Sequence, residues 1–241
     1  MEHEVHEPHE TTETHVMTAI AQSRALVLGA TGGLGRAVVE ELLAAGSKVV
    51  TSSRSLNGPA GVVAHVAGDI AVADDRERVV DSAIESLGGL DVVVIASGVV
   101  GFGALELTRS DDLDRLIAVD LTGPLALCAL VAPMMDEGGA IVVVTGAVVD
   151  TPMLGTGAYA AAKAGLSVGV GVMAREWRRR GVRIIDARPP HTETGLADRP
   201  MFGQAPRLGA GLTPAAVAAR IVMAVAGDET VLAPDAFSAV S

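Results

Sequence analysis

The chain has 241 residues, a formal net charge of −11 and 49% hydrophobic residues, but only 2% aromatic residues. The negative charge argues against a nucleic-acid surface, which needs clustered positive charge, and no apolar run reaches the length of a membrane span. A chain of this length can form one well-buried domain from Ala, Val, Leu and Ile, which suits a parallel sheet covered by helices. With a single cysteine, Cys128, no internal disulfide is possible, and the cytoplasm is the simplest location.

The N-terminal segment is acidic and contains His3, His6 and His9. We expect residues 1–20 to form a disordered extension and residues 21–241 to form one catalytic domain. The histidines recur every three residues, whereas the HExxH zinc-protease arrangement requires histidines four apart on a helix, so we predict no metal site.

A strand from Ala25 to Leu28 leads into the segment GATGGLG, followed by a helix from Leu34 to Ala45. Glycines permit a tight turn that brings backbone amides close to a pyrophosphate, and the N-terminus of the helix favours negative charge. The segment therefore predicts a dinucleotide-binding turn. Its candidate binding residues are Gly29, Thr31, Gly33, Leu34 and Gly35.

The rest of the chain alternates between apolar strands and helices. Strands are predicted at Ser47–Ser52, Val62–Val66, Leu90–Ala96, Ala140–Thr145, Val182–Ala187 and Glu229–Leu232, and helices at Val72–Leu87, Ser110–Met135, Thr156–Arg180 and Thr213–Gly227. Such alternation indicates right-handed crossovers and an α/β fold of the Rossmann type, a doubly wound parallel sheet of about seven strands with helices on both faces. Ligands should bind at the carboxyl ends of the strands.

Tyr159 is the only tyrosine, and it lies four residues before Lys163 in the alanine-rich segment AYAAAKAG. In a helix the two side chains share one face, close enough for the ammonium to act on the phenol. A nearby cation favours the phenolate, so we expect Lys163 to lower the pKa of Tyr159 and make it usable in acid-base chemistry.

Together these segments resemble the short-chain dehydrogenase/reductase family from about Arg24 to Phe237. Further matches occur in family order: Asp69-Ile70, LDVVVIASG, DLTGP, AIVVVTG and the downstream segment ARPPHTETG. The resemblance implies an oxidoreductase that transfers a hydride between a nicotinamide cofactor and a small carbonyl or secondary alcohol. It also implies a homodimer or homotetramer, with Tyr159 exchanging the substrate proton and Lys163 holding the cofactor ribose.

The resemblance also indicates how the cofactor is held. Ser53 stands where an acidic residue would repel a 2′-phosphate, and the following Arg54 can pair with that phosphate, so we predict NADP rather than NAD. The other implied cofactor contacts are Asp69, Ile70, Ala96, Gly98, Pro189, Thr192 and Thr194, together with Tyr159 and Lys163. A loop from Gly195 to Gly211, with Met201 and Phe202, is expected to cover the substrate as a partly apolar wall.

The chain departs from the family pattern at the catalytic positions. Gly146 occupies the place of the serine that binds the substrate oxygen, and Pro190 replaces a glycine. The neighbouring Thr145 could supply a hydroxyl instead, although a threonine at a strand end is more often structural. Asp120 replaces the expected asparagine. It could hold a water near Lys163 and raise the pKa of that lysine, or it could have a purely structural role by hydrogen bonding to the helix backbone.

Three functions are compatible with these residues. The first is an NADP-dependent oxidoreductase with a modified site. The second is a cofactor-binding regulatory protein that has lost efficient turnover, and the third is a non-redox enzyme that uses the Tyr-Lys pair for isomerisation, dehydration or cyclisation.

Overall fold

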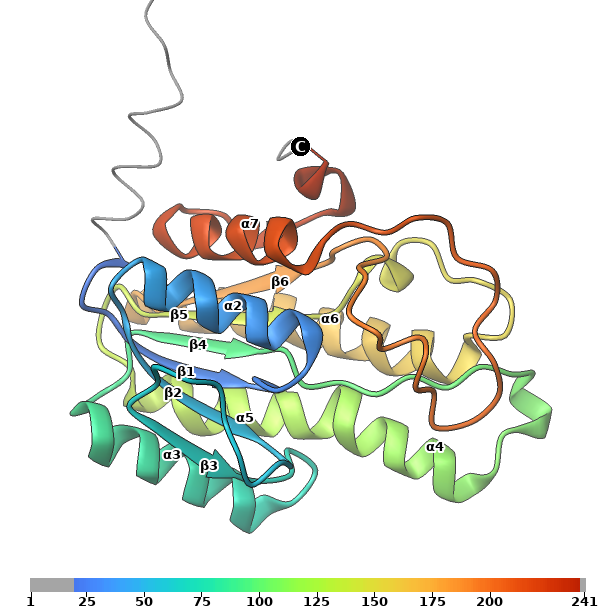
Figure 1. The fold of residues 1–241 in the computed structure, drawn as a ribbon, viewed down its shortest axis with the longest axis horizontal. Coiled ribbons are helices and arrows are strands. Elements are labelled where there is room, and N and C mark those ends of the chain that lie inside the picture. The colour runs from blue at the N-terminus through green and yellow to red at the C-terminus, as the bar shows by residue number, and fades with distance from the viewer. Residues whose placement is uncertain (1–19, 239–241) are drawn as a thin grey trace, which may run out of the picture.

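The computed structural model describes residues 20–238, whose strands form one parallel sheet (Figure 1). Within these residues the sheet has seven strands in the order β3-β2-β1-β4-β5-β6-β7. The strands are β1 (Arg24–Leu28), β2 (Lys48–Ser53), β3 (Ala64–Ala67), β4 (Val92–Ile95), β5 (Ala140–Val144), β6 (Arg183–Ala187) and β7 (Val231–Leu232). The predicted doubly wound α/β fold is confirmed. The predicted N-terminal extension lies outside the described residues, apart from Ile20.

Helices cover both faces of the sheet, with α2 and α7 on one face and α3, α5 and α6 on the other (Figure 1). Side chains alternate along a strand, so Val27 and Val94 pack toward α2 and α7, while Leu26 and Val93 pack toward the opposite layer. The longer helices are α2 (Gly33–Ala44), α3 (Ala73–Leu87), α4 (Ser110–Ile117), α5 (Gly123–Val131), α6 (Gly157–Trp177) and α7 (Pro214–Ala226). Burial on both faces explains the continuous valine and alanine runs of the central strands.

The direction of strand addition reverses between β1 and β4. From β1 the chain proceeds outward through β2 to β3, and then crosses back to place β4 on the other side of β1. Adjacent parallel strands end together here, with Leu28 paired to Ile95. This reversal opens a crevice at the carboxyl ends of the strands, where ligands bind in folds of this type.

The region predicted as one helix, Ser110–Met135, is divided in the structure. A π-helical turn, η2 (Ala118–Thr122), separates α4 from α5, and a 3₁₀ turn, η3 (Ala132–Met134), follows α5. Contrary to our expectation for the sequence, the helical run Ser110–Met134 is long and apolar enough to span a membrane, with a mean hydropathy of 1.9. Half of its apolar window is buried, and Leu127 and Val131 lie in the core beside the sheet. Packing on the sheet therefore accounts for its composition.

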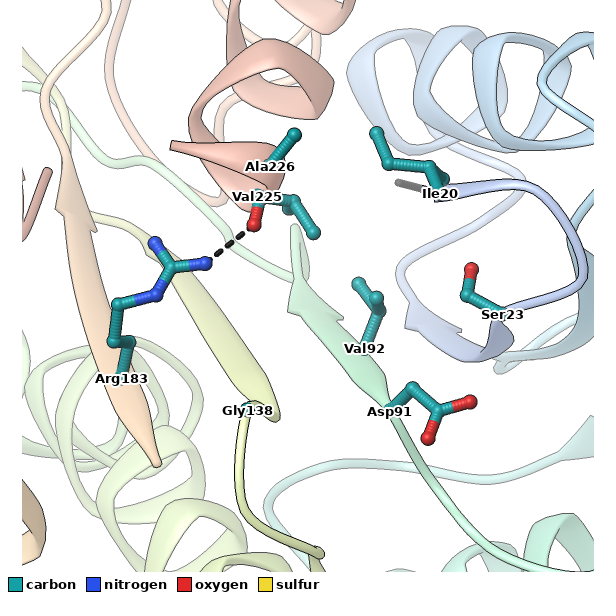
Figure 2. Close-up of a pocket in the computed structure, with 8 residues that line it drawn as sticks. All are labelled: Ile20, Ser23, Asp91, Val92, Gly138, Arg183, Val225 and Ala226. Atoms are coloured by element: carbon teal, nitrogen blue, oxygen red, sulfur yellow. Dashed lines mark hydrogen bonds between the residues drawn. The ribbon is translucent and has the colours of Figure 1, made fainter. Parts of the chain in front are cut away.

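Two charged residues near the amino ends of β4 and β6, Asp91 and Arg183, line a small cavity of about 230 Å³ together with six uncharged residues (Figure 2). Arg183 donates to the carbonyl oxygens of Ala224, at 3.1 Å, and Val225, and so caps the last turn of α7. Asp91 accepts three hydrogen bonds from Arg24, one from its main chain and two from its guanidinium. These contacts give both charged groups a structural role at the end of the sheet remote from the crevice.

Candidate active site

Tyr159 and Lys163 lie one turn apart near the start of α6 and both line a cavity of about 930 Å³. The Lys163 Nζ is 5.9 Å from the centre of the Tyr159 ring. Lys163 is 4% exposed, whereas Tyr159 is half-buried. The alanines between them leave room for the helix to pack closely, and Ala158 and Ala162 are buried against Leu116. The structure thus places the phenol and the ammonium side by side.

Asp120 forms an ion pair with Lys163, with 3.1 Å between its Oδ1 and the lysine Nζ. The same ammonium donates to the main-chain oxygen of Val144 at 3.0 Å. Asp120 is fully buried and accepts from the main-chain N–H of Val99 at 3.3 and 3.4 Å. It lies in the π-helical turn η2, a local irregularity that often marks functional positions in helices. The buried carboxylate therefore helps to fix the position of the lysine ammonium.

The surroundings of Tyr159 change its pKa in opposing directions. Burial of the phenol raises the pKa, Lys163 lowers it and Asp120 raises it, and the net shift is upward. Lys163 acts in the expected direction, but the net lowering that we expected is not met, because burial together with Asp120 outweighs the ammonium. Burial lowers the pKa of Lys163, but Asp120 and Tyr159 outweigh burial and raise it, as expected for Asp120. Lys163 is thus a cation at neutral pH.

The hydroxyl of Thr145 is engaged away from the cavity. It donates to the Oδ1 of Asp186 at 2.5 Å and also faces the main-chain oxygen of Ala187 at 3.3 Å. A hydroxyl has one proton to donate, so in this arrangement Thr145 has none left for a substrate oxygen. The neighbouring Gly146 has φ +94°, and a Cβ there would meet only the Pro189 oxygen, at 3.9 Å. The place of the family serine is therefore open space, next to a backbone conformation that only glycine adopts readily.

The cavity extends from Tyr159 along the carboxyl ends of the strands. Of the catalytic and cofactor-binding residues predicted from sequence, only Asp120 is not among those lining it. The predicted residues that line it are Gly29, Thr31, Gly33, Leu34, Gly35, Ser53, Arg54, Asp69, Ile70, Ala96, Gly98, Thr145, Tyr159, Lys163, Pro189, Thr192 and Thr194. Pro190 also lines the cavity and does not close it. The fold thus brings widely separated segments to one elongated site.

The glycine turn fits a dinucleotide pyrophosphate. A Cβ on Gly29 would lie 2.6 Å from the Ser97 nitrogen, and one on Gly33 would lie 2.7 Å from the Cα of Thr194. Only glycine permits these approaches, which leave the backbone at the start of α2 facing the cavity. The unpaired N–H groups of that helix end attract phosphate. The residues present therefore suit the cofactor that the sequence predicts.

The far end of the cavity is charged. Arg54 is exposed immediately after β2, whereas Ser53 is buried and its hydroxyl accepts from the Ser55 N–H at 3.2 Å. Asp69 accepts from Arg115 at 2.6 Å, and although burial raises its pKa, this bond and others lower it overall. Arg115 is a lining residue that sequence reasoning missed, because nothing local in α4 signals a pairing across 46 positions.

The loop after β6 closes the other end. Main-chain hydrogen bonds join Met201 to Val100 at 2.7 Å and Phe102 to Phe202 at 3.0 Å. We expected Met201 and Phe202 to form the pocket wall, but neither is among the lining residues: Phe202 packs against Gly101 and the cluster around Tyr159. Other apolar side chains form the wall, namely Val100, Phe102, Val148, Pro152, Met153, Leu196 and Leu208. Met201 and Phe202 anchor the loop instead.

Residues 23–200 match the family model described as short chain dehydrogenase, and the chain belongs to this family of oxidoreductases. The chain is 32% identical over 192 residues to the cyclic-di-GMP-binding biofilm dispersal mediator protein of Escherichia coli, covering 77% of this chain and 80% of that protein. It is 31% identical over 181 residues to a 3-oxoacyl-[acyl-carrier-protein] reductase of Salmonella typhimurium, covering 71% and 74%. A short chain dehydrogenase from Burkholderia cenocepacia, solved with NADP, superposes with a TM-score of 0.78 at 24% identity over 90% and 97% of the two chains.

Proposed function

We propose that this chain is an NADP-dependent oxidoreductase that interconverts a small carbonyl compound and its secondary alcohol. The observation that carries the proposal is the half-buried Tyr159 phenol beside the Lys163 ammonium, in a cavity that also contains a glycine-rich dinucleotide turn. Membership of the short chain dehydrogenase family supports an enzyme of this class. The apolar wall near Tyr159 favours a substrate with an uncharged, largely apolar body.

NADP, when bound, would supply or accept the hydride at the substrate carbon. In the reducing direction Tyr159 donates its phenolic proton to the substrate oxygen, and the O–H bond of the alcohol forms as the phenolic O–H bond breaks. The resulting phenolate is stabilised by the Lys163 ammonium, which Asp120 and the Val144 oxygen hold in place. The raised pKa of Tyr159 keeps the phenol protonated at neutral pH, as a proton donor requires.

The residues that would hold the cofactor are those of the cavity. The turn from Gly29 to Gly35 would bind the pyrophosphate, and Asp69 and Ile70 would lie beside the adenine. Arg54 would pair with the 2′-phosphate, because the neighbouring Ser53 brings no negative charge to oppose it. Thr192 and Thr194 would contact the nicotinamide end of the molecule.

Arg54→Leu tests the cofactor preference. Loss of a charge-assisted bond costs about 1.5–3 kcal/mol, so we expect the Kd for NADPH to rise roughly ten- to a hundredfold while that for NADH changes little. Fluorescence titration with both nucleotides gives the two constants. Arg109→Leu is the matched control, since this exposed arginine is not among the residues lining the cavity. Equal losses for both nucleotides would contradict the assignment.

Gly146→Ser tests whether the open place beside Tyr159 tolerates the family side chain. Positive φ costs a non-glycine residue about 1–3 kcal/mol, so we expect the melting temperature to fall. A Cβ at this position would meet nothing closer than 3.9 Å, so turnover should be unchanged or faster. Thermal unfolding and steady-state rates measure the two effects. A collapse of turnover with intact nucleotide binding would show that the site uses another geometry.

A second candidate function is a regulatory dinucleotide-binding protein. Gly146 supplies no hydroxyl, and the Thr145 hydroxyl is engaged by Asp186. The Escherichia coli relative named for binding cyclic di-GMP supports this alternative. Calorimetric titration with cyclic di-GMP and with NADPH, combined with a broad panel of ketones and alcohols, separates the two. Binding without any turnover would favour regulation, and carbonyl-dependent oxidation of NADPH would favour the oxidoreductase.

We also propose that the protein works as a homodimer or homotetramer in the cytoplasm. Val168 and Val172 are exposed on α6, beside glycines that would allow another helix to approach closely. The free thiol of Cys128 is buried and suits a reducing compartment. Light scattering coupled to size-exclusion chromatography measures the assembly.

A further inference from the structure

A buried carboxylate lies behind the site, on the strand next to β5. Asp186 of β6 is 2% exposed and accepts hydrogen bonds from Thr145 at 2.5 Å, Ser167 at 2.6 Å and the Nε of Arg188 at 2.8 Å. An ionised carboxylate is costly to bury unless such donors satisfy it. The proposed proton transfer does not use any of these four residues.

The bond to Ser167 connects Asp186 to the helix that carries the reactive pair. Tyr159, Lys163 and Ser167 recur every four residues and so share one face of α6. Ser167 is buried, and its hydroxyl donates directly to Asp186. The contact therefore fixes the rotation of α6 about its axis one turn beyond Lys163, and with it the direction in which Tyr159 points.

Arg188 extends the same network to the turn after β5. It donates to the Asp150 Oδ1 at 2.8 Å and to the Ser167 hydroxyl at 3.0 Å. Thr145 and Asp150 thus bracket the turn, and both are tied to the end of β6. Gly146, Ala147 and Val148 lie between them and line the cavity. The wall beside Tyr159 is thereby held at its two ends.

We propose that Asp186 is a positioning residue. Through Thr145, Ser167 and Arg188 it fixes the position of the turn 145–150 relative to the face of α6 that carries Tyr159. This inference rests on the proposed oxidoreductase function, because it assigns Asp186 a role in the same site. It also explains why a carboxylate is buried here although it reaches neither the cavity nor Tyr159. The negative charge of Asp186 also contributes to raising the pKa of Lys163, as expected for a carboxylate that lies close behind the site.

Asp186→Asn is the main test, with Asp91→Asn as its control. Asp91 also accepts three hydrogen bonds involving an arginine, but at the opposite end of the sheet. Because a misplacement of about 1 Å can cost about a hundredfold in rate, we expect Asp186→Asn to lower kcat about ten- to a hundredfold. The KM for NADPH should stay within about twofold, since the nucleotide turn is untouched. Asp91→Asn should lower the melting temperature and leave kcat unchanged.

Ser167→Ala is the milder variant if Asp186→Asn folds poorly, and it should lower kcat several-fold. Hydrogen exchange gives a readout that needs no turnover: the amides of residues 145–150 should exchange faster in both variants and not in Asp91→Asn. If the wild type oxidises NADPH but Asp186→Asn and Asp91→Asn have the same kcat and the same exchange, Asp186 is only a structural anchor. If the wild type shows no turnover, the proposed function fails, and the exchange measurement alone decides whether the network holds the turn.

Discussion

Replacing Tyr159 by phenylalanine is expected to lower kcat about a hundred- to ten-thousandfold, the usual contribution of a positioned general acid. The ring remains, so the packing around Phe202 and Ala162 should persist. NADPH should still bind, because the phenolic oxygen is one contact among many in the cavity. Carbonyl-dependent loss of NADPH absorbance measures the rate, and fluorescence titration measures the binding.

The wild type and Tyr159→Phe can be compared directly, because Tyr159 is the only tyrosine in the chain. Its phenolate absorbance can be titrated in the wild type without interference from another phenol, and the signal should vanish in Tyr159→Phe. Retained turnover in Tyr159→Phe, with nucleotide binding intact, would remove the phenol from the mechanism. The proposal would then have to be abandoned in favour of a different proton donor.

The second large effect is expected for Lys163→Met. The ammonium lowers the Tyr159 pKa against the effect of burial, so its removal should move the phenolate titration to higher pH and lower kcat. It also leaves the buried Asp120 without its partner, which should destabilise the fold by about 3–5 kcal/mol. Spectrophotometric titration and denaturant unfolding measure the two changes.

The double variant Lys163→Met, Asp120→Asn separates activity from stability. It removes the uncompensated charge, so we expect it to regain most of the lost stability without regaining turnover. A double variant as active as the wild type would contradict a role for the lysine.

The contribution of Lys163 to stability also depends on pH. In the wild type the folded-state pKa of Lys163 is raised. The stability that Lys163 contributes is therefore present below the unfolded lysine pKa of about 10.4 and is lost as pH rises through the folded value.

The sequence predicts most of the fold because its signals are local. The valine runs of β4 and β5 and the glycine turn after β1 identify their elements within a few residues. Thr213 caps α7 by accepting from the Ala216 N–H at 3.2 Å, as the Thr-Pro start predicts. Strand ends are less well predicted: β3, expected at Val62–Val66, lies at Ala64–Ala67.

The site is less predictable where it depends on contacts between distant segments. The pairings of Arg115 with Asp69 and of Thr145 with Asp186 join residues 46 and 41 positions apart, and no local pattern encodes them. The net pKa of Tyr159 depends on burial, which a sequence shows only indirectly. Likewise, Met201 and Phe202 do not line the cavity, and main-chain pairing with the segment after β4 holds their loop.

The π-helical turn at Asp120 contains one residue more than an α-helical turn, and the turn absorbs that extra residue locally. Deleting one residue between Ala118 and Thr122 would therefore restore regular winding and keep Leu127 and Val131 facing the interior. The same deletion would move Asp120 relative to Lys163 and so disturb their ion pair. We therefore infer that single-residue deletions here are tolerated better by the fold than by the site.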